Sequence, residues 1–234
     1  MTDYFLNSGS NECVGTAGGD TVGVVIPNLS RDIRRAMGIS YAAVGALGAR
    51  VGAGAQLLAM DEAVKNTNAR LISVYMPRDT KGGGGHGCLI LVGADDTADA
   101  RHAVEMGLEL TDRYLGGIYV CEAGHMEMHY SARAGEVLSS AFGAPQGSAF
   151  GMVCACPGAV GMVTADTAIK AAAVDVLKIA TPDFGTAHTN EIMAFVSGEA
   201  AAVKTSVDAG RAAGRTLLGK MCESAPRPLA EPYF

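Results

Sequence analysis

The sequence predicts an α+β fold, an α/β sandwich built from two tandem copies of one domain. The first observation is a repeat: Asp61-Glu62-Ala63-Val64-Lys65 recurs as Asp166-Thr167-Ala168-Ile169-Lys170, an offset of 105 residues (166 − 61). The second is that the same offset relates Gly93 to Gly198. The third is that strand-like and helix-like segments alternate in the same order within each copy, which is typical of layered α and β structure. We therefore expect one module of about 100 residues to have been duplicated.

Each copy contains a strand, a short helix, a strand of small residues, a second helix, a strand pair and a last helix. In the first copy the strands are expected at 22–26, 42–49 and, as a pair, at 71–76 and 88–92. The helices are expected at 30–37, from 52 and at 97–114. In the second copy the strands are expected at 126–130, 149–155 and, as a pair, at 174–179 and 191–196. The helices are expected at 133–142, from 157 and at 199–218. Because the strands flank helices, we expect the layers to surround a mixed sheet.

The limits of the repeat predict four segments. Residues 1–19 are expected to be a flexible N-terminal segment, 20–115 the first domain and 116–221 the second. Residues 222–234 contain Pro226, Pro228 and Pro232 and are expected to form an extended, exposed tail.

Composition excludes several classes of function. Glycine is about 13% of the chain (31 of 234), against roughly 7% on average, and there is no tryptophan. The net charge of −6 and the lack of a basic run argue against nucleic acid as a partner. No apolar stretch reaches the roughly 18 residues that span a bilayer, so no membrane partner is expected. The six cysteines lack paired C-x-x-C spacing, which favours a reducing, cytoplasmic setting.

The most distinctive segment is Pro77-Arg78-Asp79-Thr80-Lys81-Gly82-Gly83-Gly84-Gly85-His86-Gly87, between two predicted strands. Four consecutive glycines predict a loop whose backbone approaches another group closely. A nucleotide-binding P-loop is not expected, because there the lysine follows the glycines and a helix begins, whereas here the lysine comes first and a strand follows.

Several segments resemble the shell-protein domain of bacterial microcompartments. Ala149–Val153 followed by Ala165–Ala172 is similar to that domain's first strand and helix, and Gly198–Lys204 to the start of its second helix. Val24-Val25-Ile26-Pro27 resembles the domain's usual final strand but stands first here. This order is a circular permutation, and it occurs in both copies. Together with the glycine-rich loop, it is similar to the tandem shell proteins of the propanediol- and ethanol-utilisation type.

The resemblance implies a homotrimer whose six domains form a pseudohexameric tile in the shell of a cytoplasmic bacterial microcompartment. Expected partners are other hexameric and pentameric shell proteins, and encapsulated enzymes that bind the N-terminal segment. The strand-connecting loops are expected to approach the centre of the tile and to let small polar metabolites cross the shell. By position, the pore-lining residues are Lys81, Gly82, Gly83, Gly84, Gly85, His86, Phe184, Gly185, Thr186, Ala187 and His188.

The resemblance also implies residues at the tile edge, where neighbouring tiles meet. Lys65 and Lys170 match the family's edge lysine, and Arg133 matches its edge arginine. The first copy has Asn28 where the arginine is expected, so the two edges differ. The alternative for the lysines is an ordinary solvated position at the end of a helix.

Two other classes of function are weighed against a shell protein. Cys154 and Cys156 lie on one face of a strand, where buried free cysteine is the ordinary interpretation. Some tandem shell proteins that this sequence resembles hold an iron–sulfur cluster on the three-fold axis. Such a cluster needs thiolate ligands, and the expected axial loops contain no cysteine, although Cys88 follows the first one closely. Asp79, Lys81, His86 and Cys88 could form a catalytic group, but a glycine-rich loop would not hold them rigidly. We therefore predict no catalytic residue, metal or cofactor. The alternative is a trimeric ligand-binding or iron–sulfur redox module that does not tile.

Overall fold

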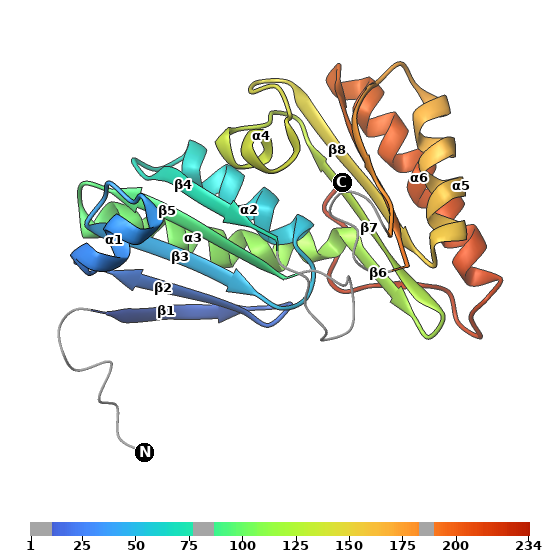
Figure 1. Ribbon diagram of the computed structural model, residues 1–234. Helices are drawn as coiled ribbons and strands as arrows, with labels where there is room; N and C mark the ends of the chain where they lie inside the picture. Colours follow the sequence, from blue (N-terminus) through green and yellow to red (C-terminus); the bar gives the residue numbers. More distant parts are fainter. Residues whose placement is uncertain (1–10, 77–86, 183–189) are drawn as a thin grey trace.

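The computed structural model describes residues 11–76, 87–182 and 190–234, and it contains two sheets with helices packed on them (Figure 1). The first sheet has the order β1-β2-β3-β5-β4, and its strands are β1 (Glu12–Ala17), β2 (Thr21–Ile26), β3 (Ala43–Ala49), β4 (Arg70–Tyr75) and β5 (Cys88–Ala94). The helices of this first half are α1 (Arg31–Met37), α2 (Gly54–Lys65) and α3 (Thr97–Tyr114).

The second half repeats this arrangement. Its sheet has the order β11-β6-β7-β8-β10-β9, and its strands are β6 (Ile118–Cys121), β7 (Gly124–Ser131), β8 (Ala149–Cys156), β9 (Asp175–Ala180), β10 (Ile192–Gly198) and β11 (Arg227–Pro228). Its helices are α4 (Glu136–Phe142), α5 (Gly158–Ala171) and α6 (Ala200–Gly219). A 3₁₀ turn, Leu115–Gly117, connects the halves. The duplicated α+β sandwich is thus confirmed.

The expectation of a mixed sheet is wrong. Every strand pair in the described residues is antiparallel. α2 connects β3 to β4 and α5 connects β8 to β9, but in each case another strand lies between the two and pairs antiparallel with both.

Within the segment 1–19, which was expected to be flexible, residues 12–17 are a β-strand. They form β1, which pairs with β2 through a turn in which Gly19 and Asp20 have φ of 72° and 52°. Glycine and aspartate tolerate this left-handed conformation better than most residues, which allows the tight reversal. β6 and β7 form the corresponding hairpin in the second half and were also not predicted as a pair.

Small residues let the helices approach the sheets closely. A Cβ on Gly45 in β3 would lie 2.6 Å from Val104 Cγ2 of α3, and one on Gly151 in β8 would lie 2.7 Å from Val207 Cγ2 of α6. These contacts also identify the faces: α3 covers one face of the first sheet, and α6 covers one face of the second. In Figure 1, α5 and α6 lie on the side of the second sheet that faces away from the first half.

Local sequence explains several helix ends. Ser30 Oγ accepts the N–H of Asp32 at the start of α1, and Asp96 caps α3 in the same way. Gly38 and Gly143 follow α1 and α4 with φ of 67° and 73°, the left-handed ending that glycine favours. No helix in the described ranges combines the length and the hydropathy needed to cross a bilayer.

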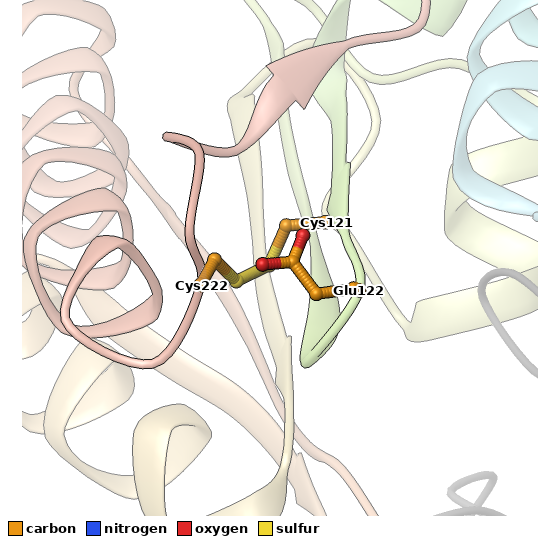
Figure 2. A group of neighbouring side chains, drawn as sticks. All are labelled: Cys121, Glu122 and Cys222. Carbon is orange, nitrogen blue, oxygen red and sulfur yellow. A yellow bond between two sulfur atoms is a disulfide. The ribbon is translucent and has the colours of Figure 1, made fainter.

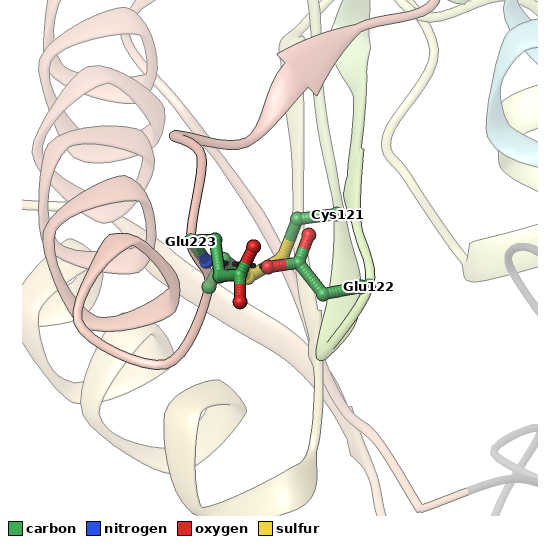
Figure 3. The surroundings of a disulfide bond; sticks show 4 residues. Cys121, Glu122 and Glu223 are labelled. Carbon is green, nitrogen blue, oxygen red and sulfur yellow. Dashed lines mark hydrogen bonds between the residues drawn. A yellow bond between two sulfur atoms is a disulfide. The ribbon is translucent and has the colours of Figure 1, made fainter.

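The C-terminal segment is extended as expected but only partly exposed. β11 pairs with β6, and Tyr233 packs edge-on against Tyr114 at a ring-centroid distance of 4.7 Å. A disulfide joins Cys121 at the end of β6 to Cys222 after α6, with Glu122 beside it (Figure 2). The N–H of Glu223 donates to Glu122 across this bridge (Figure 3). The cysteine spacing does not reveal this pair, because its members are 101 residues apart.

Candidate assembly interface

The two halves meet where α4 of the second half packs on α2 and β4 of the first. Asp61 of α2 is the polar centre of this junction. Its side chain is 1% exposed, and its carboxylate accepts the N–H groups of Gly135 (2.8 Å), Val137 (3.1 Å) and Leu138 (3.1 Å). α4 has no side-chain cap of its own, so Asp61 provides that cap from the other half. This explains why α4 begins at Glu136, later than the expected 133.

Apolar side chains surround this cap. Leu57 and Leu58 of α2 share one buried cluster with Leu138 and Phe142 of α4. Phe142 also stacks on Phe195 of β10, with ring centroids 4.3 Å apart. The junction is therefore part of the main core of the chain.

Charged groups surround the junction at its rim. Arg70 of β4 pairs with Glu136 of α4 at 3.4 Å. Lys65 Nζ lies 3.3 Å from the Asp61 carboxylate and donates to the backbone carbonyl of Arg133 at 2.7 Å. Lys65 and Arg133 also line a surface cleft of about 440 Å³ together with Tyr130.

α2 lies between the two sheets, whereas its counterpart α5 has one side uncovered. A Cβ on Gly54 in α2 would meet His129 of β7, which places α2 against the helix-free face of the second sheet. On α5, the residues 105 positions after Leu57 and Leu58 are Met162 and Val163. These are 58% and 47% exposed, whereas Leu57 and Leu58 are 0% and 2% exposed.

The first half has the matching uncovered surface. Ile33 and Met37 of α1 correspond to the buried Leu138 and Phe142, and they are 46% and 43% exposed. Val22 and Leu89, also exposed, flank Gly48 on the helix-free face of the first sheet. The second half thus leaves open, on α5, the surface that α2 uses at the junction. The first half leaves open, on α1, the surface that α4 uses there. We call the α5 side the donor face (Met162, Val163, Asp166, Asp175) and the α1 side the acceptor face (Val22, Ile33, Met37, Leu89, Arg31).

Charges on these two faces are also complementary. The residue 105 positions after Arg70 is Asp175, and the residue 105 positions before Glu136 is Arg31. At the positions that match the Arg70–Glu136 pair of the junction, the donor face therefore has an aspartate and the acceptor face has an arginine. Asp166 corresponds to Asp61; it is exposed and pairs with Lys170 at 2.8 Å.

The sequence-predicted edge residues occupy different environments. Lys170 is exposed at the end of α5, whereas the Lys65 side chain is only 22% exposed within the junction. Arg133 lies next to Lys65, so the structure brings these two together. The expected pore residues, 81–86 and 184–188, lie outside the described residues. Asp61 was not singled out from the sequence, although it belongs to the repeated segment that revealed the duplication.

The cysteines considered as possible ligands are buried or half-buried. Cys88 and Cys154 are buried, and Cys156 is half-buried on the same strand face as Cys154. Burial raises the pKa of Cys88 to about 12, and burial together with the charge of Glu191 raises the pKa of Cys154 well above its ordinary value. Neither thiol is a ready nucleophile in this state.

A duplicated antiparallel sandwich with complementary open faces defines a tandem-domain assembly protein, and comparison with known proteins supports this class. The BMC domain family matches residues 149–228. The shell protein PduB of Citrobacter freundii is 47% identical over 212 residues, covering 90% of this chain and 78% of that protein. PduB of Limosilactobacillus reuteri is 44% identical over 224 residues, covering 94% of each.

Solved structures agree with the sequence comparison. The crystal structure of a trimeric PduB is 42% identical with a TM-score of 0.91, covering 95% of this chain and 99% of that one. EtuB from Clostridium kluyveri is 47% identical with a TM-score of 0.91, covering 95% and 98%. The chain belongs to the BMC-domain family of bacterial microcompartment shell proteins. EutL from Clostridium perfringens, at 19% identity and a TM-score of 0.72, shares the fold.

Proposed function

We propose that this chain forms a homotrimeric, pseudohexameric tile of a microcompartment shell, with domains at 20–115 and 116–221. The observation that carries the proposal is the pairing of the donor and acceptor faces, which correspond to the two sides of the junction inside the chain. If the donor face of one copy packs on the acceptor face of the next, three chains place six domains around one axis and the ring closes. The related PduB of known crystal structure is trimeric, which supports three chains in the ring.

The proposal predicts that the purified chain has the mass of three copies in solution at micromolar concentration. Burial of the exposed apolar residues on both faces supplies the driving force. Light scattering coupled to size exclusion measures the mass, and electron microscopy of concentrated protein tests for sheets. A monomer or dimer would contradict the trimer. A trimer that forms no sheets, alone or with other shell proteins, would favour the alternative of a ligand-binding or redox module that does not tile.

Lys170 provides a separate test of tiling. We expect Lys170→Ala to reduce sheet formation while the trimer persists. Its counterpart Lys65 stands only at the rim of the junction, and the apolar contacts of the donor face remain; in the single chain Lys170 is 73% exposed and pairs with Asp166. The effect on stability should stay within about 0.5 kcal/mol. Lys65→Ala is less suitable, since Lys65 also contacts Asp61 and the Arg133 carbonyl. Sheets that form as readily with Lys170→Ala as with the parent would contradict the edge assignment.

We further propose a structural role for the chain instead of a catalytic one, with the loops at 81–86 and 184–188 lining a pore for small polar metabolites. Because the two loops differ in sequence, such a pore has three-fold symmetry. Other hexameric and pentameric shell proteins, and enzymes held by the N-terminal segment, remain the proposed partners. Gly45, Gly54 and Gly151 stand where two elements approach closely, and this is also the role proposed for the glycines of the loop.

A further inference from the structure

Three potential metal ligands lie together on the face of the second sheet that α2 of the first half packs against, and none of them belongs to the donor or acceptor face. His125 comes from β7, Cys154 from the neighbouring β8, and Glu191 immediately precedes β10, which pairs with β8 on its other side. One ligand atom from each lies within 4.8 Å of the other two. The side chains are 11% exposed for His125 and 0% for Glu191, and Cys154 is buried.

The distances between these atoms suit a small tetrahedral ion. His125 Nε2 lies 3.1 Å from Glu191 Oε2, and Cys154 Sγ lies 3.7 Å from the same oxygen. Zn²⁺ binds nitrogen and oxygen at about 2.0–2.2 Å and thiolate at about 2.3 Å, which places tetrahedral ligands about 3.3–3.8 Å apart. A zinc ion therefore fits with small movements of side chains whose backbones are already held by the sheet.

The surrounding charges favour a cation at this position. Glu127 is 3% exposed, lies on the same face of β7 as His125, and stands opposite Cys154 in the strand register. Its Oε2 atom has no hydrogen-bond partner among the described residues and lies 3.6 Å from His129 Nε2. Two buried carboxylates beside a thiol are costly to keep away from water unless positive charge compensates them. A divalent ion would supply that charge and would also stabilise the thiolate form of Cys154.

We propose that His125 Nε2, Cys154 Sγ and Glu191 Oε2 bind a zinc ion, with the fourth position left for water. Mixed nitrogen, sulfur and oxygen ligands are typical of zinc, whereas calcium and magnesium prefer oxygen alone. The ion would tie together β7, β8 and the residue that leads into β10. The site is specific to the second half. In the first sheet Gly48 holds the register position of Cys154, since Gly48 pairs with Val22 as Cys154 pairs with Glu127, and Asp20 stands 105 positions before His125.

The first experiment measures metal content in the full chain, expressed in zinc-supplemented medium and purified without chelator. We expect one zinc per chain. Expression with Co²⁺ in place of zinc should give the thiolate-to-cobalt charge-transfer absorption and the visible bands of a tetrahedral ion, which identify a cysteine ligand without any mutation. No thiol reductant is added, so that Cys121 and Cys222 stay joined in their disulfide. The other group of potential ligands, Cys121, Glu122 and Cys222, then does not contribute to the measured metal content.

Variants then assign the ligands. Cys154→Ser and Glu191→Gln should each weaken binding by more than about 100-fold, since even residues that only support a ligand cost 10–100-fold. Cys156→Ser is the control for loss of a neighbouring thiol. Cys156 stands opposite His125 in the strand register but is not one of the three grouped ligands, so this variant should leave the metal bound. A parent protein without metal from either medium, a cobalt form without the thiolate band, or equal metal loss in Cys156→Ser would each overturn the proposal.

Discussion

Replacing Asp61 with alanine is expected to lower the free energy of unfolding by about 3–5 kcal/mol, since each buried donor that loses its partner costs about 1–3 kcal/mol. Three N–H groups at the start of α4 lose their acceptor, and they lie where water does not reach. Lys65 loses its contact with the same carboxylate, although its partial exposure lets water replace that contact. Chemical denaturation gives the change in stability, and hydrogen exchange at Gly135, Val137 and Leu138 reports the loss of the cap directly.

Asp166→Ala is the matched control for this prediction, because Asp166 occupies the same position in the repeat but is exposed in the single chain. It should leave the protection of the α4 amides unchanged. If the proposed trimer is correct, it should instead expose the amides at the start of α1 in the assembled protein. Equal loss of α4 protection in both variants would show that Asp61 does not act as the cap.

Placing a charge on either open face is expected to abolish the trimer while the chain stays folded. Met162→Asp on the donor face, or Ile33→Asp on the acceptor face, removes an apolar contact worth about 1.5–3 kcal/mol and puts a carboxylate in its place. A ring of three chains repeats this contact three times, so the total penalty reaches about 5–9 kcal/mol before the charge is counted. Circular dichroism should remain close to that of the parent, and light scattering should give the monomer mass at micromolar concentration.

Leu229→Asp controls for the general effect of a surface charge, because Leu229 is 45% exposed but belongs to neither face. The complementary charges give a sharper check. Arg31→Asp and Asp175→Arg should each weaken association, and the two together should restore it. A trimer that survives Met162→Asp, or a double charge exchange that restores nothing, would mean that the chains meet by a different surface.

Much of the architecture could be predicted from local patterns. The 105-residue offset revealed the duplication, and apolar residues spaced three to four positions apart located α2 and α5. Strand direction could not be predicted in the same way, since a short apolar strand looks alike in parallel and antiparallel sheets. β1 was missed because its sequence of small and polar residues is stabilised by pairing with β2 and not by a buried face of its own.

The sequence by itself determined the duplicated domain, the permuted order of its elements and the resemblance to shell proteins, since these depend on residue identity and spacing along the chain. Only the tertiary structure decided which copy of each repeated residue is buried. Asp61 and Asp166 stand in matching segments, yet one caps a helix in the core and the other is exposed, because a single chain provides a neighbour for only one side of each domain. The Cys121–Cys222 bridge and the cluster of His125, Cys154 and Glu191 likewise join residues that are distant in the chain, and only the pairing of the strands brings them together.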